Sequence, residues 1–164
     1  MELVSFEPLV ADLADALRAA GLRLATAESC SGGLIAAACT ALAGSSDWFD
    51  RGFVTYSNAA KTEQLGVDAA TIAAQGAVSE PVARAMAEGA LARSAADLAV
   101  AVTGIAGPGG AVPGKPVGTV WLAVAQRGAA TAAERLQLDG DRAAVRDATA
   151  RVAIERLLVR AQAG

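Results

Sequence analysis

Several stretches of the chain carry apolar residues at the three- and four-residue spacing of amphipathic helices. The first helix is predicted over 6–20, where leucines recur every fourth position, with Ser5 as its N-cap and Gly21 at its end. A nearly all-apolar segment at 34–43 predicts a buried helix. Further helices are predicted after Ser57 or Asn58, from Asp68 to Gly76, over 79–94, and from Asp141 to about 161.

Short apolar runs between these helices predict buried strands at 22–27 and 96–104, and a further strand is predicted at 51–57. Two later segments, 119–128 and 130–140, predict a hairpin that turns at 127–129. Strands that alternate with helices, together with one hairpin, are typical of an α/β fold. We therefore expect a single-domain α/β/α sandwich over 1–164, with a mixed β-sheet that includes one antiparallel hairpin.

Composition narrows the classes of protein that the pattern allows. The chain has 164 residues, of which 54% are apolar, and a net charge of −3, so it lacks the basic surface that nucleic-acid binding needs. No apolar run reaches the length of a membrane span, and the acidic N-terminal segment predicts a folded helix rather than a signal peptide. Two cysteines separated by a predicted helix suggest free thiols and a cytoplasmic location.

The chain has no histidine and only two cysteines, which are too few of the usual ligands for a zinc site. We therefore expect a protein that is metal-free or binds only a weakly held, oxygen-ligated ion, and a reaction that requires no metal and no organic cofactor. Of the fourteen basic residues only Lys61 and Lys115 are lysines, and both lie in loop-like stretches. Because a lysine can lose its proton when desolvated and an arginine effectively cannot, these two positions are candidates for a chemical or positioning role.

The segment ESCSGG at 28–33 lies where a predicted strand ends and a helix begins, the usual place for a ligand in an open α/β sheet. Its candidate site residues are Glu28, Ser29, Cys30, Ser31, Gly32 and Gly33. The glycines let the backbone approach a substrate, and free amides of the first helical turn can bind an anion or oxyanion. The plainer interpretation is a capped turn, in which Ser31 caps the helix.

The segment YSNAAK at 56–61 also follows a strand and begins a helix. If the two strands are neighbours, Lys61 and Ser29 converge. A serine nucleophile needs a base, and in a chain without histidine the candidates are a lysine, a carboxylate or a terminal amine. Ser–Lys pairs are a known variant, and burial would lower the pKa of the lysine. The alternative is a solvated surface lysine.

Two further segments contribute candidates. TGIAGPGG at 103–110 follows the third strand and supplies Thr103 and free backbone amides. Its continuation, GGAVPGKP, approaches a phosphate loop, but Pro116 replaces the required hydroxyl residue and a strand follows instead of a helix. Lys115 is therefore expected to be structural, with contact to a phosphate as the alternative. At the start of the last helix, Arg142 and Arg146 share a face, and an arginine in this first turn is suited to a phosphate.

Cys30 is a rival to Ser29, because Glu28, Lys61 and Cys30 together are similar to the Glu-Lys-Cys set of other carbon–nitrogen hydrolases. Neighbouring residues at a strand end point in opposite directions, so we expect only one of Ser29 and Cys30 to face the pocket. The residues alone do not decide which.

Taken in order, these segments resemble the CinA C-terminal domain family, whose stand-alone members are nicotinamide mononucleotide deamidases. The resemblance rests on TAESCSGG, GSSDWFDRGFVTYSNAAK, GAVSE, AVTGIAGPGG, KPVGTVW and GDRAAVR, which together span nearly the whole chain. It implies hydrolysis of the carboxamide of nicotinamide mononucleotide by a Ser–Lys pair, which falls on Ser29 and Lys61. The family's pocket positions fall on Tyr56, Asn58, Thr103 and Arg142. Ser31 replaces the family's usual threonine and keeps the hydroxyl.

The mechanism expected from this resemblance is acyl transfer to Ser29, with Lys61 as the base and Arg142 holding the phosphate. Backbone amides of either Ser31 to Gly33 or Thr103 to Gly104 are expected to stabilise the oxyanion. Two alternatives stay open: a non-catalytic nucleotide-binding module, and an interaction protein linked to competence for DNA uptake. The expected partners are a small-molecule nucleotide and, from base rates alone, a second copy in a homodimer.

Overall fold

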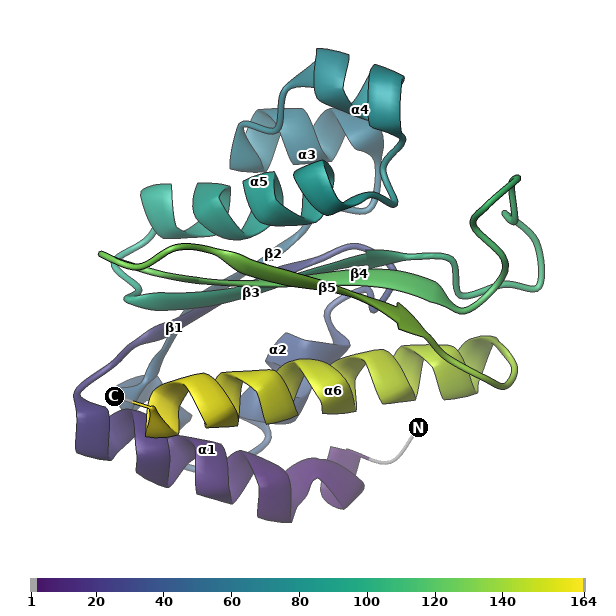
Figure 1. The fold of residues 1–164 in the computed structure, drawn as a ribbon. Helices are drawn as coiled ribbons and strands as arrows, with labels where there is room; N and C mark the ends of the chain where they lie inside the picture. Colours follow the sequence, from purple (N-terminus) through teal and green to yellow (C-terminus); the bar gives the residue numbers. More distant parts are fainter. Residues whose placement is uncertain (1–2, 164) are drawn as a thin grey trace.

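The architecture is centred on a five-stranded sheet with helices on both faces (Figure 1). The computed structural model describes residues 3–163. The strands are β1 (Leu24–Glu28), β2 (Phe49–Val54), β3 (Leu98–Gly104), β4 (Thr119–Gln126) and β5 (Ala132–Gln137). The α-helices are α1 (Glu7–Ala20), α2 (Leu34–Thr40), α3 (Asn58–Leu65), α4 (Ala69–Gln75), α5 (Glu80–Ala92) and α6 (Arg142–Gln162), and short 3-10 turns span Leu3–Phe6 and Ser45–Asp47.

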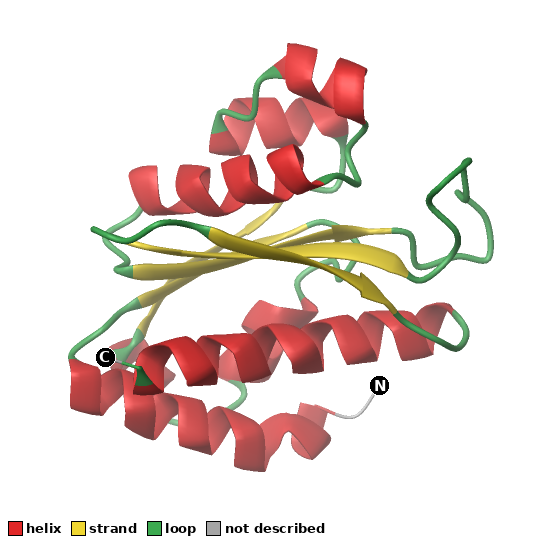
Figure 2. Ribbon diagram, viewed as in Figure 1, coloured by secondary structure: helices red, strands yellow, loops and turns green. Residues whose placement is uncertain are grey.

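The order of the strands is β2-β1-β3-β4-β5. β1 runs parallel to both β2 and β3, whereas β4 is antiparallel to its two neighbours, β3 and β5 (Figure 2). The expected sandwich with a mixed sheet and one hairpin is therefore confirmed. Because β1, β2 and β3 are parallel, their carboxyl ends meet at one edge, and the segments that follow them lie together there.

Helices α1, α2 and α6 cover one face of the sheet, and α5 covers the other, with α3 and α4 outside it (Figure 1). The sheet residues that face α5 are mostly alanines, including Ala25, Ala27, Ala99 and Ala101, and all four are fully buried. The opposite face carries larger residues such as Leu98 and Leu122. Small side chains let α5 lie close to the sheet, which is why an alanine-rich chain still forms a dense core.

The predicted caps of three later helices are confirmed. Ser57 Oγ accepts from Ala60 N, Asp68 Oδ1 from Ala70 N, and Asp141 Oδ1 from Ala144 N. The prediction for Ser5 is wrong, because a 3-10 turn precedes α1 and the N-cap position falls on Phe6.

The first two strands are shifted relative to their predicted positions. Leu22 lies in the turn that ends α1 and is not part of β1. Its amide donates to the Leu17 carbonyl, and Gly21 between them adopts the left-handed conformation. β2 ends at Val54, three residues before the predicted end at 57. α2 ends at Thr40 rather than at 43.

Gly89 lies where α5 crosses the end of α3, and a Cβ added there would overlap the carbonyl oxygen of Leu65. We predict that Gly89→Ala lowers the free energy of unfolding by roughly 1–3 kcal/mol, since α3 must move away. The loss outweighs the gain of about 1 kcal/mol that alanine brings to a helix. The control is Gly109→Ala, where a Cβ meets nothing within 4 Å. Chemical denaturation measures both, and equal stability of the two variants would contradict this packing.

Candidate active site

Ser29 follows the last residue of β1, where the chain leaves the sheet. Its amide still donates to the Val102 carbonyl at 3.1 Å, as in a continued parallel ladder, while its own carbonyl accepts from Gly32 N at 3.0 Å. This turn needs left-handed backbone at Gly32 (φ 60°) and Gly33 (φ 99°), which glycine adopts without strain. The two glycines therefore fix the turn that presents the Ser29 hydroxyl at the edge of the sheet.

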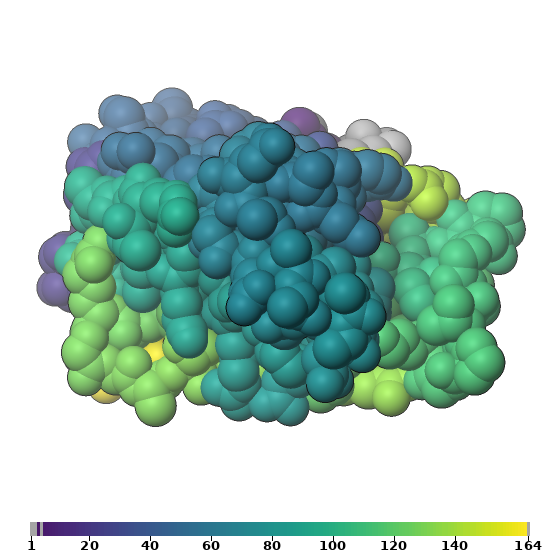
Figure 3. Space-filling view, turned by 90° about the horizontal axis from the view of Figure 1, so that it is seen from above, coloured from purple at the N-terminus to yellow at the C-terminus, as the bar shows by residue number. Residues whose placement is uncertain are grey.

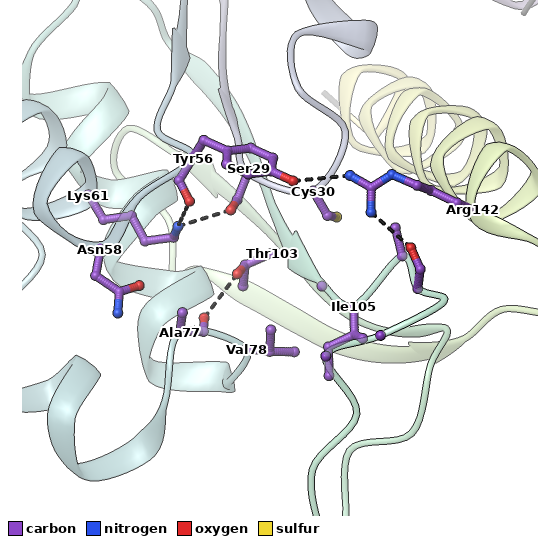
Figure 4. A pocket seen from close by; sticks show the side chains of 15 residues that line it. Ser29, Cys30, Tyr56, Asn58, Lys61, Ala77, Val78, Thr103, Ile105 and Arg142 are labelled. Atoms are coloured by element: carbon purple, nitrogen blue, oxygen red, sulfur yellow. Dashed lines mark hydrogen bonds between the residues drawn. The ribbon is translucent and has the colours of Figure 1, made fainter.

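Lys61 reaches Ser29 from the first turns of α3, the helix that follows the neighbouring strand β2. Its Nζ lies 2.9 Å from Ser29 Oγ and 2.9 Å from the Thr55 carbonyl oxygen, with the Tyr56 carbonyl oxygen at 3.3 Å (Figure 4). The side chain is only 1% exposed. The expected convergence of the two residues is thus confirmed, and the interpretation of Lys61 as a solvated surface lysine is wrong.

Burial lowers the pKa of Lys61 from its ordinary value of 10.5, because desolvation penalises the ammonium form. Among the described residues, no carboxylate lies within ion-pair distance of Nζ to oppose this effect. Two carbonyl oxygens hold the amine in place without adding a full negative charge. The lowered pKa moves Lys61 toward the neutral amine that a general base for serine requires.

Cys30 also lines the cavity, so the expectation that only one of the two neighbours faces it is wrong. The reason is that strict alternation of side chains holds only in extended backbone, and the chain turns at Ser29. Burial, with a further contribution from the charge of Glu28, raises the pKa of the Cys30 thiol to about 12. The thiolate is the nucleophilic form of cysteine, so this environment disfavours Cys30 as the nucleophile.

Glu28 lies behind the turn at residues 29–33 rather than in the cavity. It is completely buried, and its carboxylate accepts from Ser31 Oγ (2.6 Å), Ile35 N (2.9 Å) and Ala36 N (3.0 Å). The Glu28 carboxylate therefore caps the first turn of α2. The Ser31 hydroxyl donates to this carboxylate and does not itself cap the helix. Of the predicted substrate-binding residues, Glu28, Ser31, Gly32 and Gly33 are not in the cavity wall. This corrects their expected placement.

The cavity next to Ser29 has a volume of about 260 Å³. Its wall includes the remaining predicted residues, Ser29, Cys30, Tyr56, Asn58, Lys61, Thr103, Gly104 and Arg142. Lys61 and Arg142 are the only charged residues among those that line it. A small pocket with a hydroxyl, a buried amine and a guanidinium suits an anionic substrate with a polar reactive group.

Arg142 is the first residue of α6, and its guanidinium reaches the cavity from the right in Figure 4. Nη1 donates to the Gly107 carbonyl at 2.9 Å and Nη2 to Tyr56 Oη at 3.1 Å. Tyr56 is 62% exposed and lies just beyond the end of β2. Arg146, one turn later, instead donates to the Ser31 carbonyl and so supports the turn.

The sequence assigned no role to Ala77 and Val78, which form the wall opposite Ser29. They belong to GAVSE, a segment whose only signal was its place in the ordered motifs. Thr103 Oγ1 donates to the Ala77 carbonyl at 2.9 Å, so the Thr103 hydroxyl holds this wall in position.

Lys115 Nζ donates to the Gln75 carbonyl at 2.8 Å and fastens the long loop between β3 and β4 to the end of α4. That loop projects beyond the α3–α5 surface in Figure 3.

Within residues 3–163, histidine, cysteine and acidic side chains form no group of three that could hold a metal ion. None of the helices described in this range is long and apolar enough to cross a membrane.

The fold and the cavity define an α/β protein with a buried Ser–Lys pair where parallel strands end. The chain belongs to the CinA family, because the model of the CinA C-terminal domain matches residues 6–160. The crystal structure of a CinA-superfamily protein from Klebsiella pneumoniae superimposes with a TM-score of 0.93 at 40% identity and covers 100% of both chains. A competence/damage inducible protein from Agrobacterium tumefaciens gives 0.91 at 49% identity over 94% of each chain.

Two kinds of relative are similar to this chain. A CinA-like protein of Mycolicibacterium vanbaalenii is 57% identical over 88% of this chain, but the match covers 34% of that protein. The chain thus spans about a third of the length of such CinA-like relatives. The nicotinamide-nucleotide amidohydrolase PncC of Pseudomonas putida is 53% identical, and the match covers 92% of this chain and 93% of that protein.

Proposed function

We propose that this protein hydrolyses the carboxamide of nicotinamide mononucleotide, giving nicotinic acid mononucleotide and ammonia. The observation that carries the proposal is the 2.9 Å contact between Ser29 Oγ and the buried Lys61 Nζ. The substrate comes from relatives named nicotinamide-nucleotide amidohydrolase, including one from Escherichia coli that is 51% identical over 87% of this chain. Hydrolysis of an amide is the reaction that a serine activated by a base performs.

In the first half of the reaction, neutral Lys61 accepts the proton of Ser29 as Oγ attacks the carboxamide carbon. The tetrahedral intermediate collapses when Lys61 returns that proton to the departing nitrogen, which leaves as ammonia. In the second half, Lys61 takes a proton from water as the water oxygen attacks the acyl carbon. Lys61 then gives this proton to the departing Ser29 Oγ, and the product leaves as the carboxylic acid, which ionises in solution. Lys61 is therefore a neutral amine at the beginning and at the end of each half.

Arg142 is the group proposed to hold the phosphate. Its guanidinium lies at the cavity wall, and its present partners are two neutral oxygens, from Tyr56 and Gly107. A phosphate makes stronger, charge-assisted hydrogen bonds with a guanidinium than these neutral groups do. Asn58, at the start of α3, is left to contact the remaining polar groups of the nucleotide.

The proposal is tested by incubating the protein with nicotinamide mononucleotide and measuring ammonia and nicotinic acid mononucleotide together. The expected result is equal amounts of the two products over many turnovers. Saturable binding without either product would instead favour the non-catalytic nucleotide-binding module. A cytoplasmic location and a homodimer stay predictions from the sequence.

The pH dependence of the reaction follows from the state of Lys61. Below the pKa of Lys61 the amine is protonated and cannot act as a base, so kcat/KM should rise with pH through that pKa. We predict an inflection below 10.5, because burial lowers the pKa of Lys61. The pKa of Cys30 is raised to about 12, so this thiol would give a rise only at far higher pH. If kcat/KM stayed constant or fell as the pH rose toward 10.5, the assignment of Lys61 as the general base would be contradicted.

A further inference from the structure

One backbone amide at the edge of the sheet points away from β4. β3 pairs with β4 in an antiparallel register, in which Gly104 lies opposite Val120 and Thr103 opposite Trp121. The amide of the next residue, Ile105, donates to the Thr119 carbonyl at 2.9 Å. Because residues of an antiparallel strand alternate in the direction of their amides, the amide of Gly104 is directed toward β1.

β1 provides no acceptor for this amide. In a continued parallel ladder Gly104 N would donate to the Ser29 carbonyl, just as Ser29 N donates to the Val102 carbonyl. The chain turns after Ser29, however, and that carbonyl accepts from Gly32 N instead. The register of β1 with β3 ends at the pair Glu28–Val102, so within residues 3–163 this ladder offers the Gly104 amide no acceptor, and Gly104 lines the same cavity as Ser29.

The other set of amides that the sequence left open, those of Ser31 to Gly33, lies outside the cavity wall, and Gly32 N already donates to the Ser29 carbonyl. The amides that follow, at the start of α2, are occupied as well. Ile35 N and Ala36 N donate to the Glu28 carboxylate, and Leu34 N donates to the Ser31 carbonyl. Glu28 thus places a negative charge where an oxyanion would have to bind, and an oxyanion would be repelled from it. Of the two sets that the sequence left open, the one at Gly104 is available.

We propose that the amide of Gly104 donates to the oxyanion of the tetrahedral intermediate. As the bond between Ser29 Oγ and the carboxamide carbon forms, the π electrons of the carbonyl move to its oxygen and the serine proton moves to Lys61. The oxygen gains its charge beside a donor that is fixed by the sheet and needs no rearrangement. This inference rests on the proposed amide hydrolysis and names one of its catalytic groups.

A side-chain substitution at Gly104 cannot test the amide, because an added Cβ would lie 2.9 Å from the Thr119 carbonyl oxygen and nearer still to the Val120 side chain. The test is therefore a backbone ester, made by translating glycolic acid at position 104. The ester removes the N–H and keeps the shape. The matched control is the ester at position 105, made with the α-hydroxy analogue of isoleucine, which removes a donor that pairs within the sheet.

The expected result is that the ester at 104 lowers kcat for ammonia release by about 10²–10³-fold, with little change in KM or melting temperature. The ester at 105 should lower the melting temperature and leave kcat much closer to that of wild type. An ester at 104 with wild-type kcat would overturn the inference while leaving the amidase intact. Absence of ammonia release by the all-amide protein would instead overturn the proposed function.

A second measurement uses the unmodified chain and does not depend on folding of the ester. The measurement uses an analogue of the substrate that has an aldehyde in place of the carboxamide. Ser29 Oγ adds to the aldehyde carbon and forms a hemiacetal oxyanion. In ¹⁵N-labelled protein we expect the amide proton of Gly104 to shift downfield on binding. A shift confined to the amides of residues 31–33, with none at 104, would overturn the inference.

Discussion

Replacement of Lys61 by methionine is expected to reduce kcat for ammonia release by about 10³-fold or more, since the reaction loses its general base. Methionine has nearly the length of lysine and suits a side chain that is 1% exposed, so the fold should persist. Ser29 would keep its hydroxyl but lose the partner 2.9 Å away that removes its proton. Steady-state kinetics with nicotinamide mononucleotide measure the loss.

The chain offers a matched control, because it has one other lysine. Lys115 donates to a backbone carbonyl in the loop between β3 and β4 and does not line the cavity. Lys115→Met should therefore keep kcat near that of wild type. Lys61→Arg keeps the positive charge but cannot act as a base. Full activity of Lys61→Arg would mean that Lys61 only positions the substrate, against the proposed mechanism.

Replacement of Ser29 by alanine is expected to lower kcat by at least about 10⁴-fold, because no covalent intermediate can form. Ser29 Oγ accepts from Lys61 Nζ alone among the described side chains, so its loss leaves the Glu28 network intact. Binding of the product, nicotinic acid mononucleotide, should be nearly unchanged in this variant. Calorimetry and the ammonia assay separate the two effects.

Cys30→Ala is the counterpart of this variant. Cys30 contacts the same cavity, but its thiol is held in the protonated form by burial and by the neighbouring charge of Glu28. We therefore expect Cys30→Ala to keep most of the activity and to lose only some packing. If Cys30→Ala were inactive and Ser29→Ala active, the thiol would be the nucleophile.

Much of the fold could be predicted from local patterns because its signals are local. Gly21, Ser57, Asp68 and Asp141 end or cap helices through contacts within a few residues, and these contacts are present. The Ser5 cap failed because the chain forms a 3-10 turn before α1, which side-chain identity alone does not encode. The predicted strand ends were wrong where a residue takes part in a helix cap or a turn and therefore does not pair with the neighbouring strand, as at Leu22.

The site was predictable to the extent that it depends on strand order. Once β1 and β2 are parallel neighbours, Ser29 and Lys61 must meet, and the absence of histidine from the sequence had already limited the bases. The role of Glu28 could not be predicted, since a carboxylate beside a nucleophile has the same sequence whether it points into a cavity or back to α2. Nor could the freedom of the Gly104 amide, which depends on the register between two strands.

The central claim is that Ser29 is acylated, and it is tested most directly by trapping the acyl-enzyme. A p-nitrophenyl ester of nicotinic acid mononucleotide has a better leaving group than the amide, so acylation should outpace hydrolysis and give a burst of nitrophenol. Acid quenching followed by peptide mapping locates the acyl group. We predict one acyl group per chain on Ser29, and none in Ser29→Ala. An acyl group on Cys30, or turnover of the ester without a burst and without any adduct, would contradict this account.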